Sequence, residues 1–538
     1  MPDADPSTAD PLATDPLAAF AWHPEPELIG VTDPARSRAA LEALGEATWR
    51  EALDYLYDHA QARSMGEPVG YDELRRVFFG DSLTPEPAPR HPLPSASVLL
   101  EFRKRLAPFQ LNAFHPRALS YFTPPPLVAS IAGEVLAQWT NQGVDVWHAG
   151  PTAAFVEEEV IRWLCDLVGY GEGSFGLLTS GGVMANFIGM ALARDIHVPR
   201  VTGATEPPRG RALEDLRVYT SDQTHFSVGR ALDELGFPPE TLVVVPSDDR
   251  FRLHAEPVSN AIAADRAAGL TPIAIAAVAG STNTGSIDLI PDLAGLARRE
   301  QLWFHVDAAY GGAARLSARD AGRVPGLELA DSVTVDPHKW FFQAYDIGGL
   351  LVRDGSLLAA TFGRRRPEYY RGADGQGTAP RSADDGHDAS HADQLNFYKL
   401  GFEGTRRWRA LKLWLSWKHL GTTGFGRLIE RTDDLATVLA GRIADSDDFE
   451  AMPAEPELSV VCFRHLPGGQ AAAHAGDPVA LDRHQDSLAA KLEASGDAWL
   501  STTILRGRTY LRAGIVNYLT TEADLDRILH TLRELARP

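Results

Sequence analysis

The sequence predicts an α/β protein with a mostly parallel central sheet, an N-terminal helical segment and a small C-terminal α+β domain. Between about residues 110 and 360, short apolar or β-branched runs alternate with stretches of helical periodicity. This alternation is typical of right-handed βαβ units, because parallel strands need a crossover that is usually a helix. The expected strands are 176–179, 217–220, 241–245, 273–278, 302–306, 332–335 and 348–352.

Length, composition and charge exclude several classes of protein. A chain of 538 residues is longer than one small core requires and predicts several domains. No apolar run approaches the roughly 18–20 residues that a membrane span needs, so no membrane association is expected. The net charge of −21 repels a phosphate backbone, and the three arginines at 364–366 are too few to offset it, which argues against nucleic-acid binding.

The two cysteines indicate the redox environment. Cys165 and Cys462 lie far apart in the sequence and outside any C-x-x-C pattern. The sequence therefore predicts neither a disulfide framework nor a metal site. A reducing cytoplasmic location is expected.

The order of segments predicts four regions. Residues 1–33 are acidic, rich in proline and alanine, and lack the basic start and apolar core of a secretory signal, so a disordered leader is expected. Residues 34–110 carry apolar side chains at helical spacing and form the N-terminal helical segment. The large domain is expected over 111–425 and the small domain over 426–538.

Two stretches refine this division. Residues 363–396 are rich in Gly, Asp, Ser, Arg and His with almost no apolar periodicity, which predicts a mobile loop within the large domain. A long helix beginning near Arg406 is expected to end at Gly421. Weak strands at 458–463 and 509–515 are expected in the small domain.

Lys339 is the residue with the most distinctive chemical setting. It follows an apolar strand, in the segment Asp-Pro-His-Lys-Trp at 336–340. A lone lysine is usually a solvated surface charge, so only the neighbouring residues can indicate that Lys339 is reactive. Burial lowers the pKa of an amine, and a neutral amine condenses with an aldehyde to form a Schiff base. We therefore expect Lys339 to be buried and reactive.

Asp307 ends another apolar strand, in the segment His-Val-Asp-Ala-Ala-Tyr at 305–310. A lone aspartate in this place is more often a helix cap or loop residue. Its spacing to Lys339 suits two consecutive strands joined by a crossover, so both side chains can reach one cleft. A carboxylate in such a cleft can keep a pyridine nitrogen protonated.

Two further motifs follow predicted strands. Ser180, Gly181 and Gly182 form a turn that leads into a helical pattern, which is how backbone N–H groups and a helix N-terminus bind an anion. His225 comes shortly after the strand at 217–220, where its ring could lie flat on a ligand. Each motif alone is weak, because Ser-Gly-Gly turns and structural histidines are common.

Together and in this order, the four motifs resemble the group II pyridoxal-5′-phosphate (PLP) decarboxylases, the family of aromatic-L-amino-acid and glutamate decarboxylases. The resemblance covers about residues 110–425. It implies the PLP fold type I, which is aspartate-aminotransferase-like, with PLP as cofactor and an interlocked homodimer. It also implies that the chain is a lyase that acts in amino-acid metabolism, which is part of carboxylic-acid metabolism.

The resemblance assigns roles to individual residues. It implies that Lys339 carries the cofactor, that Asp307 contacts the pyridine nitrogen and that His225 stacks on the ring. The remaining cofactor contacts that it implies are Ser180, Gly181, Gly182, Val183, Thr282, Ala309 and His338. Val183 departs from the pattern, because many members have a hydroxyl residue there.

The substrate and the proton donor are less well marked. The segment 114–117, Phe-His-Pro-Arg, resembles the family's early His-Pro motif, which implies substrate contacts by His115, Arg117 and Ala118. The family's mobile loop usually supplies a tyrosine that protonates the carbanion after CO₂ leaves. The nearest candidate is Tyr398, and Tyr369 or Tyr370 are weaker alternatives.

The expected reaction is decarboxylation of a neutral hydrophobic L-amino acid, aromatic or branched aliphatic, to its amine, with glutamate less favoured. Three alternatives remain open. The first is decarboxylation-dependent oxidative deamination to an aldehyde. The second is another fold-type I reaction, such as that of an aminotransferase or lyase. The third is a binding scaffold without activity, which the trio of Lys339, Asp307 and His225 argues against.

Overall fold

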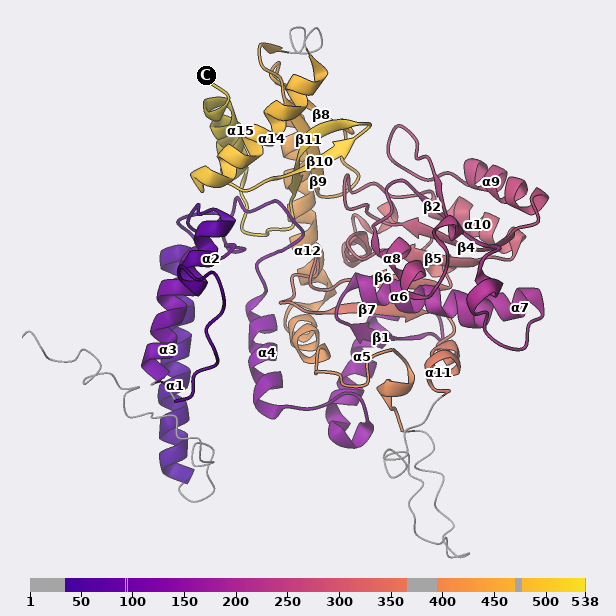
Figure 1. Ribbon diagram of the computed structural model, residues 1–538, viewed down its shortest axis with the longest axis horizontal. Coiled ribbons are helices and arrows are strands. Elements are labelled where there is room, and N and C mark those ends of the chain that lie inside the picture. The colour runs from indigo at the N-terminus through magenta and orange to yellow at the C-terminus, as the bar shows by residue number, and fades with distance from the viewer. Residues whose placement is uncertain (1–33, 92, 94, 365–393, 470–476, 538) are drawn as a thin grey trace, which may run out of the picture. The chain divides into compact units, whose positions relative to one another are not determined.

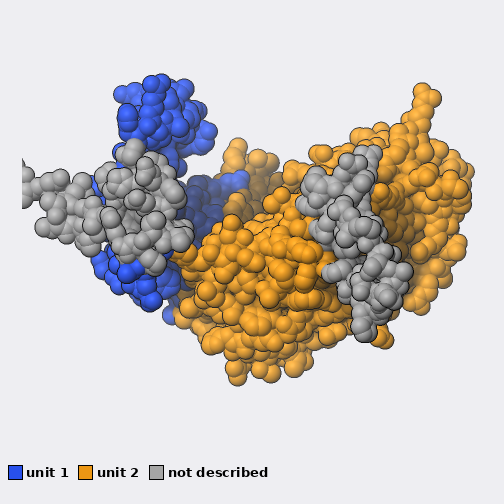
Figure 2. All heavy atoms as spheres, turned by 90° about the horizontal axis from the view of Figure 1, so that it is seen from below, with its two compact units in different colours: residues 1–119, 486–500, 523–538 blue, residues 120–485, 501–522 orange. Residues whose placement is uncertain are grey.

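The computed structural model of the chain describes residues 34–91, 93, 95–364, 394–469 and 477–537. The chain divides into two compact units, coloured separately in Figure 2. Unit 1 comprises residues 1–119, 486–500 and 523–538, and unit 2 comprises residues 120–485 and 501–522. Each unit is therefore built from segments that lie far apart in the sequence.

A seven-stranded sheet forms the centre of unit 2, and its strand order is β1-β7-β6-β5-β4-β2-β3. Neighbouring strands are parallel from β6 to β3, whereas β7 is antiparallel to both β1 and β6. The predicted α/β architecture with a mostly parallel sheet is confirmed. The strands are β1 Phe175–Thr179, β2 Leu216–Ser221, β3 Leu242–Val245, β4 Thr271–Val278, β5 Trp303–Asp307, β6 Ser332–Val335 and β7 Gly348–Val352.

Helices cover this sheet because its strands are apolar on both faces. Every residue of β5, β6 and β7 is buried, as is typical of strands packed between helices. Helix α6 packs across β1, β7, β6 and β5, with α8 beside it (Figure 1). The helices that precede, connect or follow these strands in unit 2 are α4 Val128–Thr140, α5 Pro151–Val168, α6 Gly182–Leu192, α7 Val198–Thr202, α8 Ser227–Glu234, α9 Ala255–Ala267, α10 Ile290–Glu300 and α11 Ser356–Phe362.

A long helix and a second sheet complete unit 2. Helix α12, Ala410–Ala444, bends at Gly421, whose φ of 62° and ψ of 169° are not helical. The expected helix end at Gly421 is thus a kink, and the expected boundary between residues 425 and 426 falls inside α12. The second sheet is antiparallel, with the order β10-β11-β9-β8. Its strands are β8 Phe449–Ala451, β9 Val460–His465, β10 Ser501–Leu505 and β11 Arg508–Gly514.

Unit 1 contains the predicted N-terminal helices together with late segments of the chain. Its helices are α1 Pro34–Asp54, α2 Tyr71–Phe79, α3 Ser95–Glu101 and α15 Glu522–Leu535. The C-terminal part of α14 Pro478–Ser495 also belongs to this unit. The backbone of Ala118 pairs with that of Trp499 in a short parallel bridge within this unit. In the described part of the chain, no helix is both long and apolar enough to cross a membrane.

Candidate active site

The carboxyl ends of β1, β2, β4, β5 and β6 surround a cavity of about 360 Å³. Each of these strands stops at the cavity and passes directly into a segment that lines it, as is usual for ligand sites in open α/β sheets. The structure brings together here all the residues that the sequence assigns to the cofactor. They are Ser180, Gly181, Gly182, Val183, His225, Thr282, Asp307, Ala309, His338 and Lys339.

Lys339 lies in the turn that follows β6, and its side chain is 23% exposed. Its Nζ atom lies 3.1 Å from Oδ2 of Asp336. Burial lowers the pKa of Lys339, but the carboxylates of Asp336 and Asp307 outweigh burial and raise this pKa above its ordinary value. The expectation that burial leaves the amine neutral is therefore wrong for the free protein, in which the amine is an ammonium paired with Asp336.

Asp307 stands at the end of β5, where two donors hold its carboxylate. The backbone N–H of Ala309 donates to Oδ1 at 3.0 Å, and the side-chain amide of Asn186 donates to Oδ2 at 2.8 Å. Asp307 is 7% exposed and lines the cavity. Such a carboxylate can hold the proton of a pyridine nitrogen, which is the role that PLP requires.

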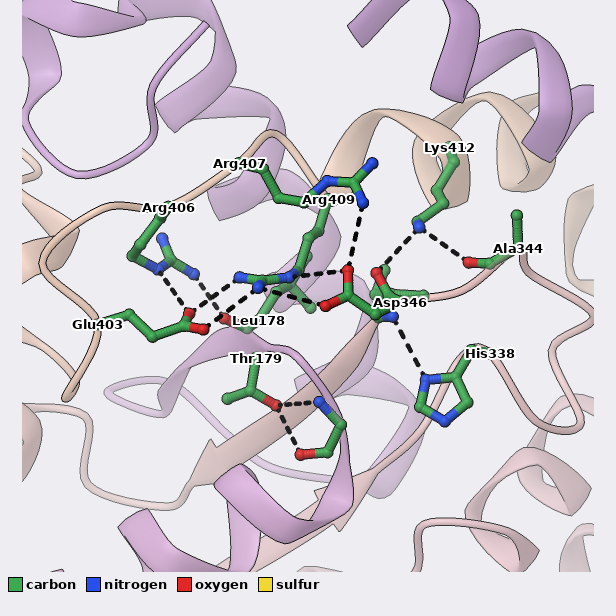
Figure 3. A network of polar contacts seen from close by, with 12 residues as sticks. Leu178, Thr179, His338, Ala344, Asp346, Glu403, Arg406, Arg407, Arg409 and Lys412 are labelled. Carbon is green, nitrogen blue, oxygen red and sulfur yellow. Dashed lines mark hydrogen bonds and ion pairs between the residues drawn. The ribbon is translucent and has the colours of Figure 1, made fainter. Parts of the chain in front are cut away.

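The glycine turn after β1 is shaped for an anion. Gly181 has a φ of 152°, and the hydroxyl of Thr179 accepts the N–H of Gly181 at 3.3 Å (Figure 3). This φ favours glycine at 181, and a Cβ atom at Gly348 would lie 2.5 Å from Cα of Gly181, so Gly348 has no room for a side chain. Helix α6 begins directly afterwards at Gly182. Backbone N–H groups and a helix N-terminus therefore converge where a phosphate group can bind.

An amine, a carboxylate and an anion turn are the groups that PLP needs, so the residues present fit this cofactor. Lys339 would hold its aldehyde, Asp307 its pyridine nitrogen, and the turn at Gly181 its phosphate. In the described part of the chain, no cluster of three or more His, Cys, Asp or Glu residues is placed to hold a metal ion.

His225 and His338 approach the cavity from different segments. The hydroxyl of Ser227 lies 2.8 Å from Nδ1 of His225, and burial lowers the pKa of this histidine. Nδ1 of His338 accepts the backbone N–H of Ile347 at 3.3 Å, and burial lowers the pKa of His338 as well. Both rings are therefore neutral near pH 7.

Several residues of the site were given no role by sequence reasoning. Asp336 lies three residues before Lys339, and this spacing is the signal that could have found it. Tyr345 lines the cavity, with its hydroxyl 3.0 Å from the hydroxyl of Thr123 and its ring centroid 4.7 Å from that of His338. Asn186 also lines the cavity, but nothing in its sequence context distinguishes it from other residues of a helix.

A group of ion pairs, fully buried at Arg406 and Glu157 and partly exposed at Arg407 and Asp346, lies beside the glycine turn and the segment that carries Tyr345, and part of it is drawn in Figure 3. It joins α4, α5 and the start of α12 to the segment before β7. We call it the ionic cluster, and it consists of Glu134, Glu157, Asp346, Glu403, Arg406, Arg407, Arg409 and Lys412.

The ionic cluster fixes two stretches of backbone that reach the cavity. Arg406, 1% exposed at its side chain, pairs with Glu157 and donates to the carbonyl oxygen of Leu178 in β1. Lys412 donates to the carbonyl oxygens of Ala344 and Asp346, at 2.8 and 2.9 Å, on either side of Tyr345. The strand before the glycine turn and the segment that carries Tyr345 are therefore both anchored to α12 or the residues just before it.

Tyr398 does not line the cavity. Its backbone N–H donates to the carbonyl oxygen of Asp145 at 3.0 Å, and the amine of Lys399 lies 5.6 Å from its ring centroid. The alternatives Tyr369 and Tyr370, and most of the predicted mobile loop, lie outside the described residues.

The three predicted substrate residues belong to unit 1. His115 and Ala118 are buried there, and burial together with the charge of Arg117 lowers the pKa of His115 to about 4. The guanidinium of Arg117 pairs with Asp524 at 2.9 Å and with Asp497 at 3.1 Å. Both carboxylates belong to the same unit, so Arg117 has a structural task there in addition to any contact with substrate.

A second cavity, of about 520 Å³, lies near the amino ends of β5 and β6. Its lining includes Arg200, Arg298 and Arg353, but none of the predicted site residues. Volume alone therefore does not identify the site, and the convergence of an amine, a carboxylate and an anion turn does.

Comparison with known proteins agrees with this geometry. A family model described as "Pyridoxal-dependent decarboxylase conserved domain" matches residues 80–466. The aromatic-L-amino-acid decarboxylase of Bacillus atrophaeus is 31% identical over 90% of this chain and 94% of its own length. The L-2,4-diaminobutyrate decarboxylase of Rhizobium meliloti is 30% identical over 90% of both chains. The crystal structure of mouse CSAD superposes with a TM-score of 0.81 at 26% identity, over 93% of this chain and 99% of the other.

Proposed function

We propose a substrate class from the premise that the chain belongs to the pyridoxal-dependent decarboxylase family. It is a PLP-dependent carboxy-lyase that acts on an amino acid. The proposed substrate is a neutral hydrophobic L-amino acid, aromatic or branched aliphatic, and the proposed product is its amine. As the family resemblance implies, the working form is proposed to be a homodimer in the cytoplasm.

The charges around the cavity carry this proposal. Among the described residues that line it, the charged side chains are Asp307, Asp336 and Lys339. Asp336 is paired with Lys339, and Asp307 faces the position of the pyridine nitrogen. The described lining thus offers no free cation for a side-chain carboxylate such as that of glutamate. It also offers no free acid for a side-chain amine such as that of diaminobutyrate. It does offer apolar surface, from Val183 and Met184.

The two relatives differ in substrate, since one is an aromatic-L-amino-acid decarboxylase and the other a decarboxylase of the cationic amino acid L-2,4-diaminobutyrate. Burying a charged substrate side chain without an opposite charge is costly. A cavity whose charged residues are already engaged therefore favours a substrate with a neutral side chain.

When bound, PLP supplies the electron sink for the bond between Cα and the carboxylate. Lys339 would hold the cofactor through its amine and leave its aldehyde carbon open to the substrate amine. Asp307 would keep the pyridine nitrogen protonated, and the glycine turn at Gly181 would bind the phosphate. His225 would lie against the ring. Contacts of His115, Arg117 and Ala118 with the substrate remain proposals from the family resemblance.

Product analysis tests the proposal directly. We would incubate the PLP-loaded protein with aromatic, branched aliphatic, acidic and basic amino acids, and identify products by mass spectrometry. Amine from a neutral hydrophobic amino acid is the expected result. Amine from glutamate or diaminobutyrate alone would contradict the proposed substrate class, and aldehyde with hydrogen peroxide and ammonia would move the protein to the oxidative reaction.

Two variants check that the products come from this site. Lys339→Ala is expected to lose both the covalent cofactor and all product, and an active Lys339→Ala protein would exclude the assignment. Asp307→Asn is expected to retain PLP, because the phosphate and Lys339 contacts remain, but to lose most turnover.

Proton return to Cα is assigned to Tyr398 by the resemblance alone. Loss of the donor is expected to shift products from amine to aldehyde. Tyr398→Phe is therefore compared with Tyr345→Phe, because Tyr345 is the tyrosine of the described chain whose ring is beside His338 in the cavity. Unchanged products from Tyr398→Phe would exclude Tyr398 as the donor.

A further inference from the structure

A continuous line of hydrogen bonds runs from Trp303 to His225, and its last three members, Asn186, Ser227 and His225, line the cavity. It passes through the side chains of β5, β6, α6 and α8, and its interior members are at most 1% exposed. We call it the neutral chain, and it consists, in order, of Trp303, Ser332, His305, Asn186, Ser227 and His225.

The first half of the neutral chain has a fixed direction. The indole N–H of Trp303 can only donate, and it donates to the hydroxyl oxygen of Ser332 at 3.1 Å. The hydroxyl of Ser332 lies 2.8 Å from Nδ1 of His305 and can donate to it. Burial holds the pKa of His305 well below its usual range, so the ring is neutral and carries one proton, which the oxygen of Asn186 places on Nε2. This N–H donates to Oδ1 of Asn186 at 2.9 Å.

Asp307 sets this direction. A carboxylate can only accept, so the group of Asn186 that lies 2.8 Å from Oδ2 of Asp307 must be the amide nitrogen. The reverse orientation would set two oxygens against each other without a proton between them. The hydroxyl of Thr334 completes the set by donating to Oδ1 at 2.7 Å, so all four hydrogen-bonding positions of Asn186 are used.

The second half of the chain transmits this orientation to His225. The other N–H of the Asn186 amide donates to the hydroxyl oxygen of Ser227 at 2.7 Å. The proton of Ser227 is therefore available to Nδ1 of His225, 2.8 Å away, and the backbone N–H of Ser227 points at the same nitrogen at 3.3 Å. With two donors aimed at it, Nδ1 is an acceptor, and the proton of the neutral ring is on Nε2.

We propose that Asn186 is a positioning residue that holds His225 in its Nε2–H tautomer while it orients the carboxylate of Asp307. Among the described residues none bonds to Nε2 of His225, and the ring lines the cavity. Nε2 thus presents an N–H donor, not a lone pair, to a bound cofactor or substrate. His225 can then hold an oxygen atom of the ligand, and it cannot act as a proton-accepting base at that atom. The catalytic consequence rests on the proposed function, whereas the tautomer does not.

Neutron crystallography of the PLP-loaded protein tests the tautomer directly. Deuterium is expected on Nε2 and not on Nδ1 of both His225 and His305, with the Asn186 amide nitrogen facing Asp307. Deuterium on Nδ1 of His225, or a reversed amide, would overturn the proposal. This readout does not depend on finding a substrate, so failure of the proposed function and failure of the tautomer assignment remain distinguishable.

A pair of variants tests whether the orientation matters for the reaction. Ser227→Ala removes the hydroxyl donor to Nδ1 of His225 and leaves the bond between Asn186 and Asp307 intact. Its kcat is expected to fall at least about 10-fold, as for residues that orient a functional histidine elsewhere, with PLP affinity unchanged. Thr334→Val removes a partner of the same amide without changing its direction, so its kcat and cofactor absorbance are expected to stay at wild-type values. Equal kcat for Ser227→Ala and Thr334→Val would overturn the role in catalysis.

Asn186→Leu tests the dual role. It is expected to shift the pH midpoint of the cofactor's visible absorbance, because Asp307 loses a donor, and to lower kcat more than Ser227→Ala does. An unchanged absorbance titration in a folded Asn186→Leu protein would show that Asn186 does not act on Asp307. If this variant does not fold, the comparison of Ser227→Ala with Thr334→Val still tests whether the orientation of His225 matters for the reaction.

Discussion

The neutral chain, which reaches the cavity, and the ionic cluster, which anchors backbone segments that lead to it, are two polar networks built on opposite principles. The neutral chain uses uncharged groups, and each proton on it has one possible place. The ionic cluster uses carboxylates, guanidinium groups and an amine, and its cations also donate to backbone carbonyl oxygens. The first region determines where protons lie, whereas the second determines where the backbone lies.

This difference follows from the energetics of burial. A buried charge needs a counter-charge and further hydrogen bonds, so it stabilises one backbone geometry strongly when they are present and destabilises the fold when one is removed. A neutral hydrogen bond contributes only about 0.5–1.5 kcal/mol net, but its direction can be relayed from group to group. Variants of the ionic cluster should therefore change stability, and variants of the neutral chain should mainly change the chemistry of the site.

The largest effect on stability is expected from Glu157→Leu. Glu157 is fully buried, and its loss leaves the guanidinium of Arg406 buried without a carboxylate within hydrogen-bonding distance. The cost should be about 3–5 kcal/mol, seen as a lower first transition in thermal unfolding of the PLP-loaded protein. Glu159→Gln on the same helix is the matched control, because Glu159 pairs with an exposed Lys418 and should cost about 1 kcal/mol or less. Equal losses of stability for Glu157→Leu and Glu159→Gln would contradict the expected difference between the buried and the exposed ion pair.

The next effect is a dependence of stability on pH that comes from the neutral chain. Burial lowers the pKa of His305 from 6.5 to about 4. Below about pH 6.5 the unfolded chain binds a proton that the folded chain does not, so stability falls as the pH drops towards 4, by about 3 kcal/mol. His305→Gln should have a shallower fall of unfolding temperature between pH 6.5 and 4 than the wild-type protein. Parallel curves for the two proteins would contradict this assignment.

A smaller loss is expected from Lys412→Met, at about 2–3 kcal/mol. The variant leaves the carbonyl oxygens of Ala344 and Asp346 without their donor, but Glu134 keeps its pair with Arg407. Hydrogen exchange should speed up in the peptide that contains Tyr345. Lys418→Met, in an exposed pair on the same helix, should leave this peptide unchanged, and equal exchange in both variants would exclude the anchoring role of Lys412.

The smallest effect is expected from Ser332→Ala, at about 1 kcal/mol, because it removes neutral hydrogen bonds. Asp307 still imposes the direction of the Asn186 amide in this variant. The visible absorbance of the bound cofactor should therefore match that of the wild-type protein. A shifted absorbance spectrum would mean that the direction is set from the Trp303 end alone.

The sequence predicts the central sheet well because its strands are short, apolar runs bounded by turns. All seven expected strands occur, with their ends displaced by at most two residues. In contrast, β10 was not predicted, because its sequence Ser-Thr-Thr-Ile-Leu alternates between partly buried and exposed positions and has few apolar side chains. The predicted helix end at Gly421 is wrong because a glycine gives the same sequence signal at a kink as at a helix end, and α12 continues past it.

For the site, the residues at strand ends could be predicted and their interactions could not. Lys339, Asp307 and His225 follow strands, and topology alone brings them to one edge of the sheet. The sign of the pKa shift of Lys339 depends on its 3.1 Å distance to Asp336, which no sequence pattern contains. The sequence gives no signal for Asn186 for a similar reason, because its role arises from partners on three other elements, α8, β5 and β6.

The composition of unit 1 also has a consequence for synthesis on the ribosome. Arg117 emerges early, but its partners Asp497 and Asp524 are translated several hundred residues later. At about 5–20 residues per second, this arginine and the helices before it wait for roughly tens of seconds. The early segments of unit 1 can already pair with one another, as Tyr55 does with Asn112. Unit 2 also needs a late segment, residues 501–522, so both units can be completed only near the end of synthesis.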